Sequence, residues 1–253
     1  MIANYSDLKD KTFLVTGASS GIGQGIAIAL GGQGANLVIT GRNMEGLEET
    51  ASLAESKVII KQADLTDEDQ REELVESLPQ INGICHTAGI INPFPIRYLN
   101  QKEFDKVFSI NATAPILLTS QVIGKKKLRD HSSLVFMSSV SSNRAMKGGS
   151  IYTISKAALE AFSRSITLEH ANKGIRANSI RPGLVETEIY KRAEELVRAV
   201  GSHDSLKEYK SRHLLGTGTV SDVAQTALFL LSSASSWITG TEITIDGGLG
   251  CQI

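Results

Sequence analysis

The chain contains 253 residues, of which 41% are hydrophobic and 21% charged, and its formal net charge is −1. This length and composition are typical of one large globular domain, and the near-neutral charge indicates neither a nucleic acid nor an anionic membrane as a partner. No uncharged apolar run has the length of a membrane span, and residues 1–11 lack the pattern of a signal peptide, so we expect a cytoplasmic protein.

Strand-like and helix-like segments alternate along the whole chain. Short apolar runs rich in strand-forming residues predict strands at Thr12–Thr16, Asn36–Thr40, Lys57–Gln62, Gly83–His86, Ser133–Ser138, Arg176–Ile180 and Glu242–Ile245. The intervening segments predict helices at Gly21–Gln33, Met44–Ser56, Asp67–Ser77, Gln101–Lys127, Ser150–Ala171 and Ser221–Ser232. With right-handed crossovers, this alternation predicts one α/β domain over residues 1–253: a doubly wound Rossmann fold whose seven-stranded parallel sheet carries helices on both faces.

A glycine-rich turn joins the first predicted strand to the first predicted helix. It reads Thr16-Gly17-Ala18-Ser19-Ser20-Gly21-Ile22-Gly23. Glycines let the backbone turn tightly and approach a ligand, and the N-terminus of the following helix offers free N–H groups to a phosphate. The turn therefore predicts a pyrophosphate site; a structural turn without a ligand is the alternative.

Tyr152 and Lys156 are four residues apart in the predicted helix Ser150–Ala171, so their side chains share one face. A neighbouring ammonium group favours the phenolate form of tyrosine. Lowering the pKa of a phenol from about 10 to near neutrality corresponds to roughly 4 kcal/mol. Such a tyrosine can give a proton to a carbonyl oxygen or take one from an alcohol. A chance pair on a helix is the alternative reading of these two residues.

Six motifs follow one another in a specific order: Thr16-Gly17-x-x-x-Gly21-x-Gly23, His86-Thr87-Ala88-Gly89, Asn111, Ser139, Tyr152-x-x-x-Lys156 and Pro182-Gly183. With them the chain, from about Leu8 to Gly248, resembles the short-chain dehydrogenase/reductase family, and most of all its 3-oxoacyl-carrier-protein reductases and their close relatives. The resemblance implies hydride transfer between a nicotinamide and a carbonyl or secondary alcohol, without a metal.

The resemblance also assigns catalytic roles. Tyr152 would be the proton donor and acceptor, and Lys156 would lower its pKa and bind the nicotinamide ribose. Ser139 would hold the substrate oxygen; it is preferred over Ser138 because it lies thirteen positions before Tyr152 and because successive strand side chains face opposite ways. Asn111 would connect Lys156 to water, unless it is only a helix residue with local hydrogen bonds.

The cofactor residues follow from the same resemblance. The turn residues would surround the pyrophosphate, a second group would line adenine and its ribose, and a third would bracket the nicotinamide, together with Tyr152 and Lys156. These residues are Gly17, Ser19, Ser20, Gly21, Ile22 and Gly23; then Asp64, Leu65, Ala88 and Gly89; then Pro182, Gly183, Val185 and Thr187.

The end of the second predicted strand bears on the choice between NAD and NADP. An acidic residue there binds the ribose hydroxyls of NAD, but this chain has Gly41 followed by Arg42. A guanidinium group grips a phosphate with paired hydrogen bonds, so we predict NADP(H). NAD(H) is not excluded, because Arg42 could instead stack on adenine or point to solvent.

Three residues are read as structural. His86 stands where the family has an asparagine that ties the central strands together. It either does the same through its ring nitrogens or is a core histidine satisfied by the backbone, and we assign it no catalytic or metal-binding role. Cys85, in an apolar strand, and Cys251 are interpreted as free thiols in a reducing cytosol.

One segment, about residues 184–217, breaks the alternation with many charges and loose periodicity. In the family this position holds the substrate-covering loop; a solvated helical pair is the alternative. Pocket residues would include Ser141, Met146, Leu184, Ile189 and Tyr190.

The resemblance implies a small-molecule or acyl-thioester carbonyl substrate, with sugars and polyols as alternatives. A non-catalytic dinucleotide-binding regulator is the alternative from a different class of protein. An acyl carrier protein is acidic, so it would need a basic surface, for which Lys125, Lys126, Lys127, Arg129 and Lys173 are candidates beside a plain solvated helix end. The family pattern in Trp237–Gly240 and Glu242–Gly248 implies a homotetramer or homodimer.

Overall fold

The computed structural model describes residues 5–187, 190 and 209–251. A parallel sheet lies at the centre, with its seven strands in the order β3-β2-β1-β4-β5-β6-β7. The strands are β1 (Thr12–Thr16), β2 (Asn36–Gly41), β3 (Val58–Gln62), β4 (Ile81–His86), β5 (Leu128–Met137), β6 (Arg176–Pro182) and β7 (Glu242–Ile245). The strand order reverses between β1 and β4, which is the doubly wound Rossmann arrangement and confirms the predicted fold class.

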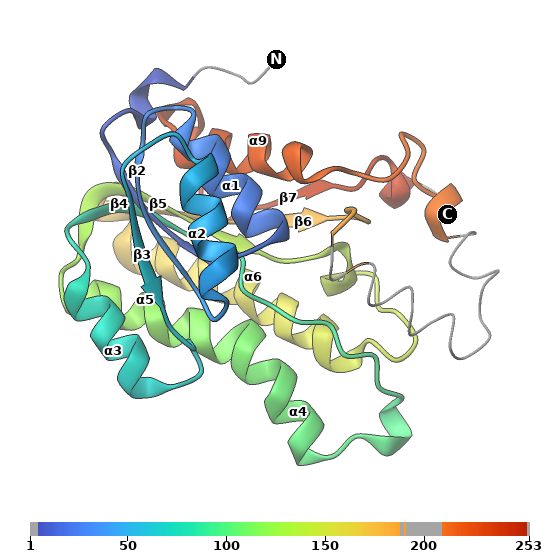
Figure 1. Cartoon of the computed structure of the whole chain (residues 1–253). Helices are drawn as coiled ribbons and strands as arrows, with labels where there is room; N and C mark the ends of the chain where they lie inside the picture. Colours follow the sequence, from blue (N-terminus) through green and yellow to red (C-terminus); the bar gives the residue numbers. More distant parts are fainter. Residues whose placement is uncertain (1–4, 188–189, 191–208, 252–253) are drawn as a thin grey trace.

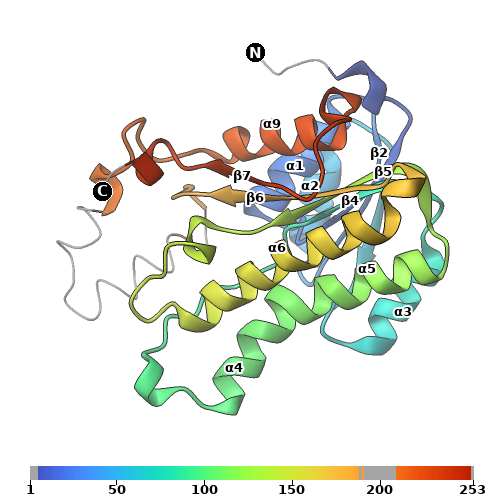
Figure 2. The same ribbon diagram turned by 180° about the vertical axis from the view of Figure 1, so that it is seen from behind.

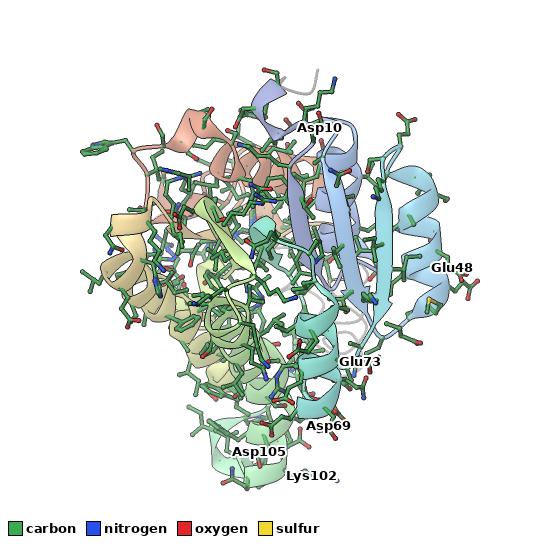
Figure 3. The ribbon with its side chains drawn as sticks, turned by 90° about the vertical axis from the view of Figure 1, so that its left-hand side faces the viewer. Asp10, Glu48, Asp69, Glu73, Lys102 and Asp105 are labelled. Carbon is green, nitrogen blue, oxygen red and sulfur yellow. The ribbon has the colours of Figure 1, made fainter. Side chains whose placement is uncertain are left out.

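Helices cover both faces of the sheet (Figures 1 and 2). One face carries α1 (Gly21–Gly31), α2 (Met44–Leu53) and α9 (Val220–Leu231), and the other carries α3 (Glu68–Ser77), α4 (Gln101–Phe108), α5 (Ala114–Gly124) and α6 (Ser150–His170). The charged side chains of Glu48, Asp69, Glu73 and Lys102 lie on the outer surfaces of these helices (Figure 3). The apolar faces are therefore left for the sheet.

Alternate side chains of the central strands pack into two separate hydrophobic cores, one on each face of the sheet. Phe13 and Val15 pack in the cluster beneath α1 and α9, whereas Leu14 between them packs in the cluster beneath α3, α5 and α6. This alternation is what the pleat of a strand imposes. A sheet buried on both faces in this way is a rigid platform for the loops at its edges.

The expected helix Gln101–Lys127 is not continuous. It consists of α4, a π-helical turn at Ser109–Thr113, and α5, which ends at Gly124. A π-helical turn holds an extra residue and is frequent at functional sites. By length and composition alone, the stretch Gln101–Gly124 is also the one helix among the described residues that could cross a membrane. It packs instead against α3 and α6, with Leu118 and Val122 in the core, as core helices of this kind do.

Strand β5 begins at Leu128, five positions before the predicted start at Ser133. Its pairing register with β4 shifts between Ile81 and Gly83, and His131 has a φ of 61°. The added residues 128–132 are mostly polar, so the apolar run on which the prediction relied begins only after them.

Candidate active site

The predicted site residues gather where the strands of a parallel sheet end. Strands β1, β2, β4, β5 and β6 all finish at one edge, at Thr16, Gly41, His86, Met137 and Pro182. The loops that follow these strands therefore meet beyond the same edge, which is the usual ligand site of doubly wound folds.

The glycine turn packs directly on the end of β4. Gly17 has a φ of 63°, and a Cβ at this position would lie 2.7 Å from the Cα of Ala88. A Cβ at Gly23 would overlap the carbonyl oxygen of Gly17 and the hydroxyl of Thr87. The turn thus needs glycine for its conformation and for close packing. Ser20, which precedes α1, makes no side-chain capping bond, so the first N–H groups of α1 are open to an anion.

Thr87 ties β1 to β4. Its hydroxyl donates to the carbonyl of Thr16, and its N–H donates to the Thr16 hydroxyl over 3.2 Å. His86, in contrast, bonds the hydroxyl of Thr119 in α5 at 2.8 Å and stacks on Phe136 at 4.9 Å between ring centroids. Burial lowers the pKa of His86 to about 3, so it is a neutral core histidine. Its partner is a side chain and not the backbone, which differs from the expectation. The residue that ties the two central strands together is therefore Thr87 and not His86.

Tyr152 and Lys156 lie side by side on α6, as their spacing predicted. The ammonium nitrogen of Lys156 is 5.6 Å from the centre of the Tyr152 ring. It donates to the carbonyl of Met137, at the end of β5, over 2.8 Å. Burial lowers the pKa of Lys156 to about 8.

The expected lowering of the Tyr152 pKa is wrong for this structure. Burial raises the pKa of Tyr152, and the nearby Tyr209 raises it further, while a hydrogen bond with Ser139 opposes these effects without cancelling them. A phenolate withdrawn from water is costly, and the ammonium of Lys156 is held by a carbonyl oxygen on β5.

Ser139 lies at the start of a single 3-10 turn, Val140–Ser142, directly after β5. Its hydroxyl accepts from the N–H of Ser141 over 3.1 Å and also forms the hydrogen bond with Tyr152. Ser138, the competing residue, directs its buried hydroxyl to the carboxylate of Glu160 over 2.6 Å. Ser139 is therefore the serine that the fold brings to Tyr152.

Asn111 occupies the middle of the π-helical turn and is fully buried. Its side-chain amide pairs with the backbone of Ile90, accepting over 2.8 Å and donating over 2.9 Å. These partners come from the loop after β4, so the bonds are not local to the helix. A Cβ at Gly89 would lie 3.2 Å from the Lys156 nitrogen and 3.3 Å from the Asn111 oxygen, which places both groups beside Gly89.

The segment after β6 reaches back to the glycine turn. A Cβ at Gly183 would press on Asp246 and on the ring of His213, and Val185 forms an isolated bridge to Gly218. A Cβ at Gly21 would lie 3.6 Å from the methyl group of Thr187. Gly21, predicted to lie at the pyrophosphate, and Thr187, predicted to lie at the nicotinamide, are thus neighbours.

Comparison with known proteins gives a consistent result. Residues 17–250 match the family described as enoyl-(acyl carrier protein) reductase. The 3-oxoacyl-(acyl-carrier-protein) reductase FabG of Rickettsia felis is 30% identical over 244 residues, which cover 96% of this chain and 98% of that protein. The chain belongs to the short-chain dehydrogenase/reductase family. It is accordingly an oxidoreductase.

Solved short-chain dehydrogenase/reductase structures share the whole fold. Levodione reductase superposes with a TM-score of 0.90 at 28% identity, covering 97% of this chain and 100% of that one. A glucose/ribitol dehydrogenase from Brucella melitensis gives 0.88 at 28% identity, covering 98% and 99%. These relatives bear names with different substrates at similar identity, so the family assignment alone fixes no substrate.

The loops after β2 and β3 of this short-chain dehydrogenase/reductase bring Arg42 and Asp64 together. Nη1 of Arg42 lies 3.8 Å from Oδ2 of Asp64, and 63% of the Arg42 side chain is exposed. Burial alone would raise the pKa of Asp64, but hydrogen bonds from Thr66 and the charge of Arg42 outweigh it and hold this pKa below its usual range. Leu65 beside them is buried. An exposed pair of this length is worth about 0–1 kcal/mol, so it does not prevent Arg42 from binding another anion.

Two site residues escaped the sequence reasoning. His213 is buried, accepts from the N–H of Leu184 over 3.0 Å and bonds the carbonyl of Tyr209 at 3.1 Å. It links the segment after β6 to the end of the expected loop. Tyr209 is close enough to Tyr152 to raise its pKa. The four-residue spacing of Tyr209 and His213, which puts them on one face of a helix, was the sequence signal that could have found them. Of the expected loop 184–217 and its pocket residues, 188–189 and 191–208, including Ile189, lie outside the described residues.

The basic residues expected to meet a carrier protein are badly placed for it. Lys125, Lys126 and Lys127 precede β5, and Lys173 precedes β6, so they lie at the amino-terminal edge of the sheet, opposite the site. Lys125 pairs with Glu76 at 2.5 Å, and Lys127 donates to the carbonyls of Glu76 and Leu78. Lys125 and Lys127 thus connect the end of α3 to the turn before β5.

Proposed function

We propose that this protein is an NADP(H)-dependent reductase and dehydrogenase that acts on a carbonyl or secondary alcohol, with 3-oxoacyl thioesters as the first substrate class to test. The observation that carries the proposal is the gathering of Asn111, Ser139, Tyr152 and Lys156 at the carboxyl edge of the sheet. A non-catalytic dinucleotide-binding regulator would not need these four side chains together.

The four side chains divide the work of moving one proton. In reduction, Tyr152 gives its proton to the carbonyl oxygen as hydride reaches the carbonyl carbon, and Ser139 donates a hydrogen bond to the same oxygen, on which negative charge develops. This leaves Tyr152 as a phenolate, which takes its next proton from solvent. The Lys156 ammonium beside the ring stabilises the phenolate until then, and Asn111 orients the adjacent loop. Oxidation runs through the same steps in reverse.

The glycine turn fits a dinucleotide, because Gly17 and Gly23 let it pack closely on Thr87 and Ala88 and because the N-terminus of α1 that follows is uncapped. The bound nicotinamide supplies or accepts the hydride. The residues that would hold the dinucleotide are Gly17, Ser19, Ser20, Gly21, Ile22 and Gly23 at the pyrophosphate; Arg42, Asp64, Leu65, Ala88 and Gly89 at the adenosine; and Tyr152, Lys156, Pro182, Gly183, Val185 and Thr187 at the nicotinamide riboside.

Arg42 is proposed to select NADP(H). Arg42→Gln is expected to raise KM for NADPH about tenfold and to leave KM for NADH within twofold, because a charge-assisted bond to the 2′-phosphate is worth about 1.5–3 kcal/mol. Initial rates with each nucleotide check this. Arg129→Gln, at the opposite edge of the sheet, is the matched control. Equal losses with both nucleotides would show that Arg42 does not read the phosphate.

Substrate class is tested by NADPH oxidation with an acetoacetyl thioester, with NADH as the paired control. Turnover with NADPH alone supports an acyl-thioester reductase, whose natural substrate would be carried by an acyl carrier protein. Binding of NADPH without turnover moves the assignment to the second candidate, a sugar, polyol or other small carbonyl compound, which the similarity to a glucose/ribitol dehydrogenase favours.

Assembly is proposed to be a homotetramer or homodimer in the cytoplasm. Large apolar side chains on α5, α6 and the segment before β7 are exposed; among them Leu168 is 87% and Trp237 98% exposed. Such side chains are typical of surfaces that another subunit covers. Light scattering of the purified protein tests this, and a monomer would contradict it.

A further inference from the structure

A buried carboxylate lies on the same face of α6 as the proposed catalytic pair. Glu160 follows Tyr152 and Lys156 at successive intervals of four residues. Its side chain is only 6% exposed. A carboxylate this deeply buried is stable only when charged or hydrogen-bonding partners surround it.

Glu160 holds both ends of the Ser139 turn. One carboxylate oxygen, Oε1, accepts from the hydroxyl of Ser138 over 2.6 Å and from that of Ser142 over 2.6 Å. Ser138 immediately precedes Ser139, and Ser142 closes the 3-10 turn that Ser139 begins, with its N–H donating to the Ser139 carbonyl over 3.0 Å. The Ser142 hydroxyl oxygen also lies 2.8 Å from that same carbonyl oxygen, so its single proton is shared between the carboxylate and the carbonyl. A single carboxylate thus grips the turn on either side of the serine that contacts Tyr152.

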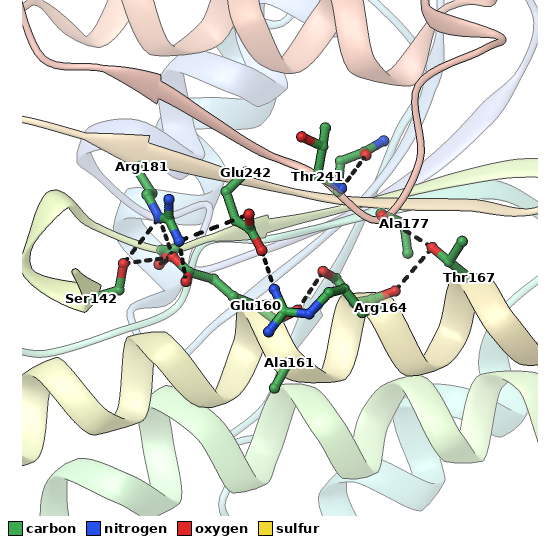
Figure 4. Close-up of polar contacts among 12 residues, drawn as sticks. Ser142, Glu160, Ala161, Arg164, Thr167, Ala177, Arg181, Thr241 and Glu242 are labelled. Atoms are coloured by element: carbon green, nitrogen blue, oxygen red, sulfur yellow. Dashed lines mark hydrogen bonds and ion pairs between the residues drawn. The ribbon is translucent and has the colours of Figure 1, made fainter.

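Arg181 completes the arrangement from the neighbouring strand. Its Nε and Nη2 atoms donate to the two oxygens of Glu160 over 2.7 and 2.6 Å (Figure 4). Nε also lies 3.1 Å from the Ser142 hydroxyl, and Nη2 lies 3.9 Å from Glu242 on β7. Paired bonds of this kind fix the direction of a carboxylate as well as its charge. Burial alone would raise the pKa of Glu160, but the bonds from Arg181, Ser138 and Ser142 outweigh it and lower this pKa, so the carboxylate stays ionised.

We propose that Glu160 and Arg181 are positioning residues that hold the Ser139 turn against Tyr152, so that the serine and the tyrosine meet the same substrate oxygen. The inference rests on the roles proposed above for Ser139 and Tyr152. One helix carries both the proton donor and the carboxylate that holds the oxygen-binding serine, so the distance between the two functions is fixed within a single rigid element.

The test is Glu160→Gln in the full-length protein, with Arg164→Gln as the matched control. Arg164 lies one turn further along the same helix and pairs with Glu242, but it does not contact the Ser139 turn. Glu160→Gln is expected to lower kcat about 10- to 100-fold, as small misplacements of reacting groups do, and to leave KM for NADPH within twofold. Arg164→Gln is expected to keep both values near those of the wild type.

A second readout needs no substrate. Amide hydrogen exchange in the peptide that spans residues 138–143 is expected to accelerate at least about tenfold in Glu160→Gln and to stay unchanged in Arg164→Gln, because local opening governs exchange. Ser142→Ala removes one of the two serine contacts without leaving a buried charge unpaired. It is expected to show a smaller change in the same direction, and it serves as the test if Glu160→Gln does not fold.

The outcomes separate this inference from the proposed function. If Tyr152→Phe or Ser139→Ala keeps full turnover, the proposed chemistry is wrong. If both are inactive while Glu160→Gln matches the wild type in kcat and in exchange, the chemistry stands and the positioning role is overturned. If the wild type turns over no carbonyl compound, the exchange measurement alone decides whether Glu160 holds the turn.

Discussion

Replacing Tyr152 with phenylalanine is expected to lower kcat about 1000-fold while leaving NADPH affinity within about threefold. The phenol is buried and its proton is the one that the substrate oxygen needs, whereas the ring itself fits the same space in the variant. Initial rates in both directions, together with fluorescence titration of NADPH, measure the two quantities separately.

Tyr209→Phe is the matched control, since it makes the same change in the other tyrosine that influences Tyr152. It is expected to retain activity within a few-fold. Loss of activity in Tyr209→Phe, with Tyr152→Phe still active, would assign the proton transfer to Tyr209.

The role of Tyr152 as proton donor and acceptor also predicts how the rates of reduction and oxidation depend on pH. The raised pKa of Tyr152 keeps the phenol protonated through neutral pH, so carbonyl reduction has its proton donor at every pH below this pKa. Alcohol oxidation needs the phenolate, and its rate is therefore expected to climb with pH through the neutral and alkaline range. An oxidation rate that is flat over this range would mean that some other group accepts the proton.

Replacing Gly17 with alanine is expected to abolish dinucleotide binding and to lower the free energy of unfolding by about 2 kcal/mol or more. The positive φ alone costs a residue with a side chain about 1–2 kcal/mol, and the new Cβ would lie 2.7 Å from the backbone of Ala88. Urea unfolding and NADPH titration measure the two effects.

Two glycines serve as controls for this change. Gly216 has a φ of 81° but open space around its Cβ position, so Gly216→Ala isolates the conformational cost. Gly124, at the end of α5, has open space and no positive φ, so alanine there is expected to cost nothing. If Gly17→Ala binds NADPH as the wild type does, the close packing of the turn on Ala88 is not needed for the cofactor.

The regular parts of the fold could be predicted because their sequences follow one period. Strands β1 and β7 have the predicted bounds, since each is a short run of strand-forming residues followed by a glycine turn. Strand β5 departed from prediction at the register shift, where five steps from Leu128 to Ser133 face two steps of β4. The helix at Gln101 departed from prediction at the π-helical turn, which holds one extra residue. Local irregularities of this kind leave the average pattern intact, so a pattern cannot reveal them.

The spatial grouping of the candidate site residues could be predicted, but their electrostatics could not. The helical spacing that put Tyr152 beside Lys156 is a local property, and the structure keeps it. The pKa of Tyr152 depends on burial by distant segments, which spacing does not contain. Glu160 and Arg181 were missed for the same reason, because their partners lie on separate elements and only the fold brings them together.

The π-helical turn accommodates one residue more than an α-helical turn does, and Asn111 lies in the middle of it. Because the extra residue is absorbed within the turn, α4 and α5 keep the relative rotation that places Val107, Leu118 and Val122 in the core. Deleting one residue between Ser109 and Thr113 would restore a regular helix and leave this packing largely intact. It would, however, remove the local geometry from which Asn111 bonds the backbone of Ile90. The extra residue therefore serves the loop after β4 more than it serves the packing of the helix.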